Sequence, residues 1–263
     1  MTRIENVPVV LLHALPLDSA MWQAQAAALR ARGHTVITPD QRGFGRTPLG
    51  TAPPSLDTVA DDLAALLDRH RIGSVALAGC SMGGYAAMAF LRRHPHRVRA
   101  LALLATRAGA DRPEEAAERI RFADLLLDDA SRDQLVAHTT PLLLGATTRT
   151  RHPDLVERVT AMAATAAPES VAWAQCAIAA RPDSLSVLCG ADVPAVVLAG
   201  DEDELVAGDE AATMAEALPR GRLVTIEAAG HLPPLEAPDR VSELLMALVD
   251  ASATEERNGE GAC

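Results

Sequence analysis

The chain is poor in aromatic residues and in cysteine. Phenylalanine, tryptophan and tyrosine together make up 2% of its 263 residues, so stacking on nucleobases or aromatic sugars is not expected as a main binding mode. The four cysteines have neither paired nor metal-type spacing along the chain. They are Cys80, Cys176, Cys189 and Cys263. The sequence therefore predicts neither a disulfide framework nor a zinc site.

Positive charge and long apolar runs are also scarce. Asp and Glu number 35 against 24 Lys and Arg, which gives a formal net charge of -11. Phosphate binding needs a basic face, so we expect no nucleic-acid partner. No apolar run approaches the roughly 18 residues that span a bilayer, and no cationic segment with a long apolar core begins the chain. We therefore expect no membrane partner and a cytoplasmic protein.

Hydrophobic residues, by contrast, are plentiful. They make up 49% of the chain, which is enough to bury one sizeable core, and a chain of 263 residues often forms a single α/β domain. The richness in alanine and arginine is typical of a bacterial coding sequence of high GC content. The composition thus favours one globular α/β domain from a bacterium.

A Gly-x-Ser-x-Gly motif occupies residues 79–83, with Ser81 at its centre. An apolar run at 75–78 precedes it and a segment rich in small residues at 84–90 follows. This order of strand, sharp turn and helix is the context of a nucleophile elbow, in which glycines allow a strained serine and a close backbone approach. The alternative is an ordinary turn that carries a hydroxyl, because the motif alone arises by chance.

Two later segments supply a carboxylate and an imidazole. The apolar run 196–199 leads into an acidic loop that contains Asp203, and the run 223–226 is followed by His231. Both would lie at the carboxyl ends of strands, where open α/β sheets build their sites. Together with Ser81 they occur in the order nucleophile, acid, histidine. The three residues are therefore a candidate catalytic triad.

Strand and helix signals alternate along most of the chain, which predicts a parallel sheet of about six strands with helices on both faces. Strands are expected near 7–12, 34–38, 74–79, 98–104, 194–199 and 222–227. Helices are expected near 19–32, from Ser55 to before Gly73, and near 82–94, 209–218 and 237–250.

The stretch 107–188 breaks this alternation and predicts several helices without a strand. Prolines at 113, 141, 153, 168 and 182 mark expected helix starts. A segment of this kind between two strands most simply forms a helical lid over the site, the alternative being a separate helical domain. Residues 1–106 and 189–252 would then form the core. The end of the chain, 253–263, has too little apolar surface to offset ordering and is predicted to be disordered.

The Ser81 elbow, the loop of Asp203 and the segment before His231 occur in the order found in the α/β-hydrolase superfamily. The chain resembles this superfamily from about Val7 to about Val249. Further matching pieces are residues 11–16 after the first strand and 39–47 after the second. Within the superfamily the chain resembles small bacterial carboxylesterases and enol-lactonases such as 3-oxoadipate enol-lactonase, on the segment 106–111 and the lid after it. The resemblance implies an α/β-hydrolase fold. Residues 43–45 lack the third glycine and the helix start that a dinucleotide-binding loop requires, so no cofactor is expected.

The same resemblance implies a serine hydrolase of a carboxylic ester or lactone, which forms an acyl-enzyme on Ser81. His231 would act as the base, and Asp203 would orient its imidazole. Backbone N–H groups of Met82 and Leu15 would form the oxyanion hole.

Several neighbours of these residues have competing interpretations. Cys80 lies beside Ser81, but an elbow exposes its central residue, so we expect Cys80 to pack at the strand end. His13 could be a base, yet we expect it to support its loop. The superfamily commonly has His-Gly where this chain has His13 and Ala14, which leaves the shape of the hole around Leu15 open.

The choice of the acid also needs an argument, because its loop is crowded with carboxylates. The spacing from Gly200 to Asp203 matches the superfamily's acid position. The other acids are expected to be solvated loop charge: Asp201, Glu202 and Glu204. Asp40 and Arg42 lie where the superfamily braces loops near the site, so we expect them to be structural.

Three classes of function remain open at this point. The leading one is the ester or lactone hydrolase, with a small or aliphatic substrate as its partner and a monomeric or homodimeric assembly. The second keeps the triad for other chemistry, as in thioesterases, carbon–carbon bond hydrolases, perhydrolases of the haloperoxidase-like type or hydroxynitrile lyases. The third is a non-enzymatic small-molecule receptor or scaffold.

Overall fold

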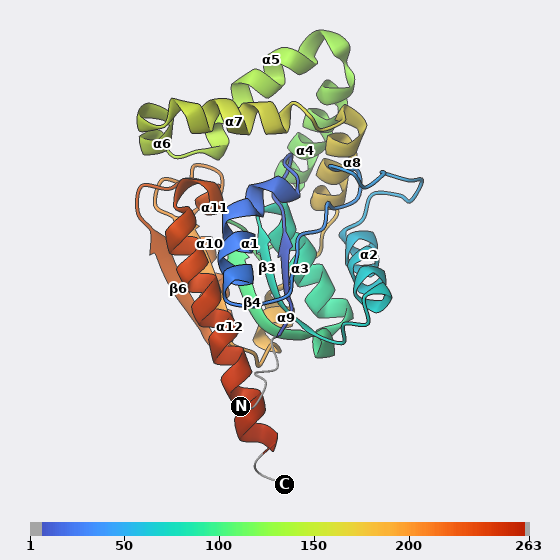
Figure 1. Ribbon diagram of the computed structural model, residues 1–263. Coiled ribbons are helices and arrows are strands. Elements are labelled where there is room, and N and C mark those ends of the chain that lie inside the picture. Colours follow the sequence, from blue (N-terminus) through green and yellow to red (C-terminus); the bar gives the residue numbers. More distant parts are fainter. Residues whose placement is uncertain (1–6, 261–263) are drawn as a thin grey trace.

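The computed structural model describes residues 7–260, and its centre is one sheet of six parallel strands (Figure 1). The strand order is β2-β1-β3-β4-β5-β6. The bounds are β1 Val9–Leu12, β2 Val36–Ile37, β3 Val75–Cys80, β4 Val98–Leu104, β5 Ala195–Gly200 and β6 Gly221–Ile226. Each strand begins and ends within two residues of its expected position, so the prediction of about six parallel strands is confirmed.

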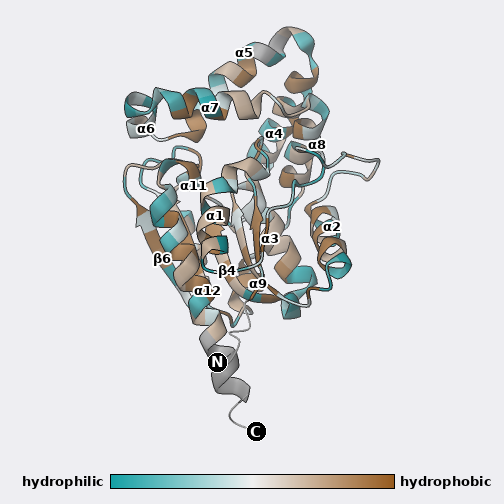
Figure 2. Ribbon diagram, in the orientation of Figure 1, coloured by the Kyte–Doolittle hydropathy of each residue, from teal (hydrophilic) through white to brown (hydrophobic). Residues whose placement is uncertain are grey.

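Helices cover both faces of this sheet, because strand side chains alternate between them. Val10 and Leu12 of β1 belong to the core that includes α2 (Leu56–Arg69), α3 (Met82–Arg93) and α10 (Gly208–Ala217). Leu11 belongs to the core on the other face, with α1 (Gln23–Ala31) and α12 (Pro238–Glu260). Figure 2 shows the hydrophobic strands between helices that carry hydrophilic residues on part of their surface. Short 3-10 helices span Ser19–Trp22, Pro95–Arg97 and Thr140–Leu143.

Local signals explain where the core helices begin. The Ser55 side chain accepts a hydrogen bond from the Asp57 N–H and so caps α2. Val59, Leu63 and Leu67 of α2 then recur at helical spacing and are buried against the sheet. Among the helices of residues 7–260, none is both long enough and apolar enough to span a bilayer.

The segment between β4 and β5 contains helices and loops but no strand, and we call it the helical insertion. It contains α4 (Pro113–Leu127), α5 (Asp129–Thr139), α6 (Ala146–Arg151), α7 (Pro153–Ala163), α8 (Pro168–Ala179) and α9 (Leu185–Cys189). Prolines stand at the first turns of α4, α7 and α8. Pro141 lies in the third 3-10 helix, whereas Pro182 precedes α9 and starts no helix. Helices α5, α6 and α7 lie together across one end of the molecule (Figure 1).

The insertion differs from the expected lid at its end. The predicted boundary at residue 188 falls inside α9, and α9 contacts α3 and α10 of the core instead of α5 to α7. Leu188 is fully buried in the core cluster that includes these two helices, which explains why α9 packs there. Figure 1 shows α9 at the opposite end of the molecule from α5.

The end of the chain also differs from expectation, because α12 continues to Glu260 where disorder was predicted from residue 253. The earlier part of this helix is anchored by the buried side chains of Val241, Leu244, Leu245, Leu248 and Val249. A packed helix lowers the cost of adding further turns, and Ala, Glu and Arg favour helix. Residues 261–263 of the predicted tail lie outside the described part of the chain.

Loops after β1 and β2 are braced by His13 and Gln41. The Gln41 N–H donates to Nε2 of His13 at 2.9 Å, and the Gln41 side-chain amide donates to the His13 carbonyl at 2.7 Å. The other ring nitrogen, Nδ1, is 3.1 Å from the Ala14 carbonyl. Because His13 is fully buried, burial lowers its pKa from 6.5 to about 4, although the contact with Ala14 opposes this.

A cluster of ion pairs joins the segment before α4 to the segment after α8. The side chain of Asp111, before α4, is fully buried and lies 2.6 Å from Nε of Arg119 and 2.8 Å from Nη1 of Arg181. It also pairs with Arg107. Burial alone would raise the pKa of Asp111, but the charges of Arg119 and Arg181 outweigh it and the pKa is lowered. Arg181 follows α8, and its guanidinium stacks on the ring of Tyr85 in α3. The cluster therefore holds the segment before α4 and the segment after α8 against the core.

We predict that Asp111→Ala lowers the free energy of unfolding by about 3 kcal/mol, because the buried Arg181 loses its carboxylate partner. Chemical denaturation at neutral pH measures this change. The matched control is Asp129→Ala, since the Asp129 side chain is 92% exposed in its pair with Arg132 and should contribute little. Equal losses in the two variants would contradict the cluster's role.

His13 gives a second prediction, on the pH dependence of stability. Its pKa is lower in the folded protein than the ordinary 6.5, so the unfolded chain binds more protons between pH 6.5 and about 4. Stability therefore falls as the pH falls through this window, by up to about 3 kcal/mol from this residue. Urea unfolding at pH 7 and pH 4 should show a smaller difference for His13→Asn than for the wild type, and identical differences would refute the assignment.

Candidate active site

Ser81 occupies a sharp turn between β3 and α3. Its backbone has φ 53 and ψ -115, a strained conformation for a residue with a side chain. The flanking glycines are required by close approach: a Cβ on Gly79 would lie 2.1 Å from the Gly83 carbonyl oxygen. One on Gly83 would lie 2.2 Å from the carbonyl oxygen of Leu12 in β1. The turn therefore has the geometry of the nucleophile elbow that the motif predicts.

The structure brings the three candidate triad side chains into one hydrogen-bonded series. Nε2 of His231 lies 2.7 Å from Oγ of Ser81. Nδ1 of the same ring lies 2.9 Å from Oδ2 and 3.1 Å from Oδ1 of Asp203. The three residues follow β3, β5 and β6, so they meet at the carboxyl ends of the strands.

Asp203 is held as a carboxylate inside this series. Its side chain is 2% exposed, and its Oδ1 also accepts the backbone N–H groups of Leu205 at 2.8 Å and Val206 at 3.1 Å. Burial pushes the pKa of Asp203 upward, but the hydrogen bond and charge of His231 and the two N–H donors outweigh it, so the pKa is lowered. Asp203 therefore stays ionised and can orient the imidazole.

The interpretation of the neighbouring acids is partly wrong. Asp201 is exposed, as expected for solvated loop charge. Glu202, however, accepts the N–H of Thr147 at 2.7 Å and its hydroxyl at 2.5 Å, and Glu204 pairs with Arg149 at 2.5 Å. Glu202 thus fastens α6 to the loop of Asp203, whereas the Glu204 side chain is 50% exposed, as expected for solvated loop charge, and its surface pair contributes little. The sequence gives no signal for these contacts, because their partners lie 55 residues away.

Glu236 is a residue of this site that the sequence did not single out. It ends the short helix α11 (Pro233–Glu236), and its carboxylate accepts hydrogen bonds from the backbone on both sides of His231. The same carboxylate also accepts donors from the helical insertion. The one signal in the sequence is a carboxylate at the end of an otherwise apolar segment, residues 232–236.

The two expected oxyanion donors are in suitable local settings. The N–H of Met82 belongs to the first turn of α3, where backbone donors have no partner within the helix. Leu15 lies in the turn after β1. Ala14, which replaces the expected glycine, is buried and has no positive φ, so its backbone does not require glycine. The assignment of Leu15 and Met82 as donors stays a prediction.

Other candidate residues near the site are committed to structural contacts. Both ring nitrogens of His13 contact backbone groups, which supports its interpretation as a loop brace. Asp40 accepts the N–H of Ser19 at 3.0 Å, and Arg42 forms two hydrogen bonds to Asp62 at 2.8 and 2.9 Å. These contacts agree with the bracing roles expected for Asp40 and Arg42.

Cys80 is fully buried beside Ser81, and burial raises the pKa of its thiol well above the usual range. Its Sγ lies 3.7 Å from the carbonyl oxygen of His231. A buried thiol of raised pKa is a poor nucleophile, so Cys80 packs at the strand end as expected. Within residues 7–260, no three His, Cys, Asp or Glu side chains converge into a metal-binding group.

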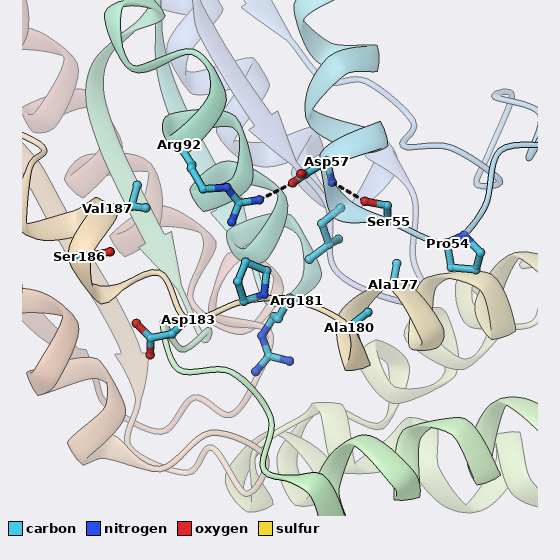
Figure 3. A pocket seen from close by; sticks show the side chains of 12 residues that line it. Pro54, Ser55, Asp57, Arg92, Ala177, Ala180, Arg181, Asp183, Ser186 and Val187 are labelled. Atoms are coloured by element: carbon cyan, nitrogen blue, oxygen red, sulfur yellow. Dashed lines mark hydrogen bonds and ion pairs between the residues drawn. The ribbon is translucent and has the colours of Figure 1, made fainter.

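A separate pocket of about 320 Å³ lies at the start of α2, beside the segment that follows α8. In Figure 3 its Arg92 points to Asp57, and the two side chains form an ion pair. Arg181, also in the lining, is bound to Asp111. None of the triad residues lines this pocket. Because its cations are already paired, it is a weaker candidate for a functional site than the triad.

Comparison with known proteins agrees with this geometry. The solved structure of a thermophilic esterase from Thermogutta terrifontis superimposes with a TM-score of 0.89 at 36% identity, covering 94% of this chain and 91% of that one. The 3-oxoadipate enol-lactonase 1 of Acinetobacter baylyi is 25% identical over 252 residues, which are 93% of this chain and 90% of the relative.

One sequence match is short, whereas the family match spans most of the chain. The AB hydrolase superfamily protein YisY of Bacillus subtilis is 36% identical over 87 residues, so this chain spans only 32% of that relative's length. The α/β hydrolase fold family matches residues 7–238. The sequence resemblance is therefore confirmed, and the protein belongs to the α/β-hydrolase family.

Proposed function

We propose that the protein is a serine hydrolase that cleaves a carboxylic ester or a lactone, with Ser81 as the nucleophile. The observation that carries this proposal is the series from Ser81 Oγ to His231 Nε2 at 2.7 Å and from His231 Nδ1 to Asp203 at 2.9 Å. A serine hydroxyl is a weak nucleophile unless a base removes its proton. His231 is within hydrogen-bonding reach for that transfer.

In the first half of the reaction, Ser81 Oγ attacks the carbonyl carbon while His231 takes the hydroxyl proton. Asp203 holds the imidazole in the required tautomer and stabilises the imidazolium that forms. The N–H groups of Met82 and Leu15 donate to the oxyanion of the tetrahedral intermediate. His231 then protonates the leaving oxygen, the carbon–oxygen bond breaks and an acyl-enzyme remains.

Water completes the second half by the same route. His231 accepts a proton from the water as its oxygen attacks the acyl carbon, and Ser81 leaves as the alcohol when it regains that proton. An ester yields an acid and an alcohol. A lactone yields one hydroxy acid, and an enol-lactone yields an enol acid that tautomerises to the keto acid. The likeness to an esterase and to an enol-lactonase supports these two substrate classes.

We predict that a small fluorophosphonate adds once to the wild type and to Cys80→Ala but not to Ser81→Ala. Intact mass measures the adduct, and release of p-nitrophenol from short acyl esters measures turnover in the same samples. The Cys80 variant is the matched control, because its thiol is the neighbouring nucleophile and has a raised pKa. A folded wild type that gains no adduct would contradict the proposal and favour a small-molecule receptor.

The acid is tested by a pair of substitutions in one loop. Asp203→Asn removes the acceptor that fixes the His231 tautomer, so we expect turnover to fall by about 10⁴-fold. Asp201→Asn is the matched control, because Asp201 is exposed and does not contact His231. Steady-state kinetics on one ester compare the two variants, and the reverse ranking would refute Asp203 as the acid.

A further inference from the structure

Glu236 stands at a junction between the loop of His231 and the helical insertion. Its Oε1 accepts the N–H groups of Gly230 and Leu232, each at 3.0 Å. Its Oε2 accepts the N–H of Gly145 and the hydroxyl of Thr148, each at 2.8 Å. One half-buried carboxylate thus binds four donors from two segments that are far apart in the sequence.

The first pair of donors flanks His231 on both sides. The peptide N–H groups before and after this residue converge on one oxygen, so the backbone that carries the imidazole is fixed at two points. Hydrogen bonds to an ionised acceptor are about twice as strong as neutral ones. Among the side chains that the structure describes, no cation forms an ion pair with Glu236, and its polar contacts are these four donors.

The second pair of donors belongs to the start of α6, where the insertion contacts the His231 loop directly. A Cβ on Gly230 would lie 2.3 Å from the N atom of Gly145, and one on Gly145 would lie 2.9 Å from the N atom of Gly230. Neither backbone can move toward the other. The start of α6 therefore limits the movement of the His231 loop toward it. Glu236 binds both α6 and this loop and so keeps them in contact.

We propose that Glu236 is a positioning residue that keeps the His231 imidazole aligned with Ser81 and couples this alignment to the seating of α6. The inference rests on the proposed function, because alignment matters only if His231 is the base. Glu236 does not contact Ser81 or Asp203 and acts through the backbone on either side of His231.

The four contacts require a carboxylate and not merely a polar side chain. A glutamine has one carbonyl oxygen and one NH₂ group, which is a donor. If the oxygen of Glu236→Gln faces Gly230 and Leu232, the NH₂ group faces the donors of α6, and the reverse orientation leaves the His231 loop unpaired. The Thr148 hydroxyl can accept from that NH₂ group, but the N–H of Gly145 cannot, so the glutamine variant loses at least one hydrogen bond, whereas Glu236→Ala loses all four.

The test measures the rate constant for fluorophosphonate addition to Ser81 together with kcat and KM on one p-nitrophenyl ester. A misplacement of about 1 Å costs up to about 100-fold in rate. We expect Glu236→Ala to lower both the addition rate and kcat by about 10- to 100-fold, with a smaller change in KM. Glu236→Gln should fall between this variant and the wild type.

Two other carboxylates provide matched controls. Glu202→Gln weakens the hold on α6 through Thr147 but leaves both N–H groups beside His231 paired. Glu227→Gln removes an exposed charge from the turn before His231 and should match the wild type. If Glu202→Gln slows fluorophosphonate addition as much as Glu236→Ala does, the attachment of α6 alone controls the rate and the positioning role is overturned.

The result separates this inference from the proposed function. A wild type that shows neither addition nor ester turnover refutes the serine hydrolase itself. A wild type that reacts at Ser81, beside a folded Glu236→Ala that reacts equally fast, refutes only the role of Glu236. Circular dichroism and thermal unfolding establish folding, and if the alanine variant is unfolded, Glu236→Gln is judged by the same criterion.

Discussion

The close contact between the first turn of α3 and the end of β1 is the constraint on which the site depends. Gly83 approaches the carbonyl of Leu12 so closely that no side chain fits between them. This contact fixes the start of α3 against the sheet and forces Ser81 into a backbone conformation with positive φ.

Around this fixed point, the other two candidate triad residues depend on loops that carboxylates hold in place. Asp203 is fixed by two backbone N–H groups of its own loop, and His231 by Glu236. Glu202 and Glu236 also bind the start of α6, so the insertion is fastened to the acid loop and to the histidine loop alike. The acidic composition of the chain thus has a local use: carboxylates satisfy backbone donors where loops meet.

The sequence predicts those features whose signals are local. The strands appear as apolar runs, and the elbow, the acid and the histidine each follow such a run at short range. The contacts of Glu202 and Glu236 could not be predicted, since their partners around Thr147 lie 55 and about 90 residues away. The packing of α9 against α3 and α10 could not be predicted for the same reason. Its apolar residues are compatible with burial in a lid or in the core, and the sequence does not show which neighbours they contact.

The cluster around Asp111 has a consequence for how such a fold can vary. It joins the chain where it leaves the sheet after β4 to the chain where it returns after α8, so the separation of these two points is set by the cluster itself. The entropic cost of closing a flexible loop between two such points grows only slowly with the length of the loop. The region between these two points can therefore vary in length and in part of its sequence while the sheet and its elbow stay the same, as long as Arg119 and the contacts of α6 with Glu202 and Glu236 are kept.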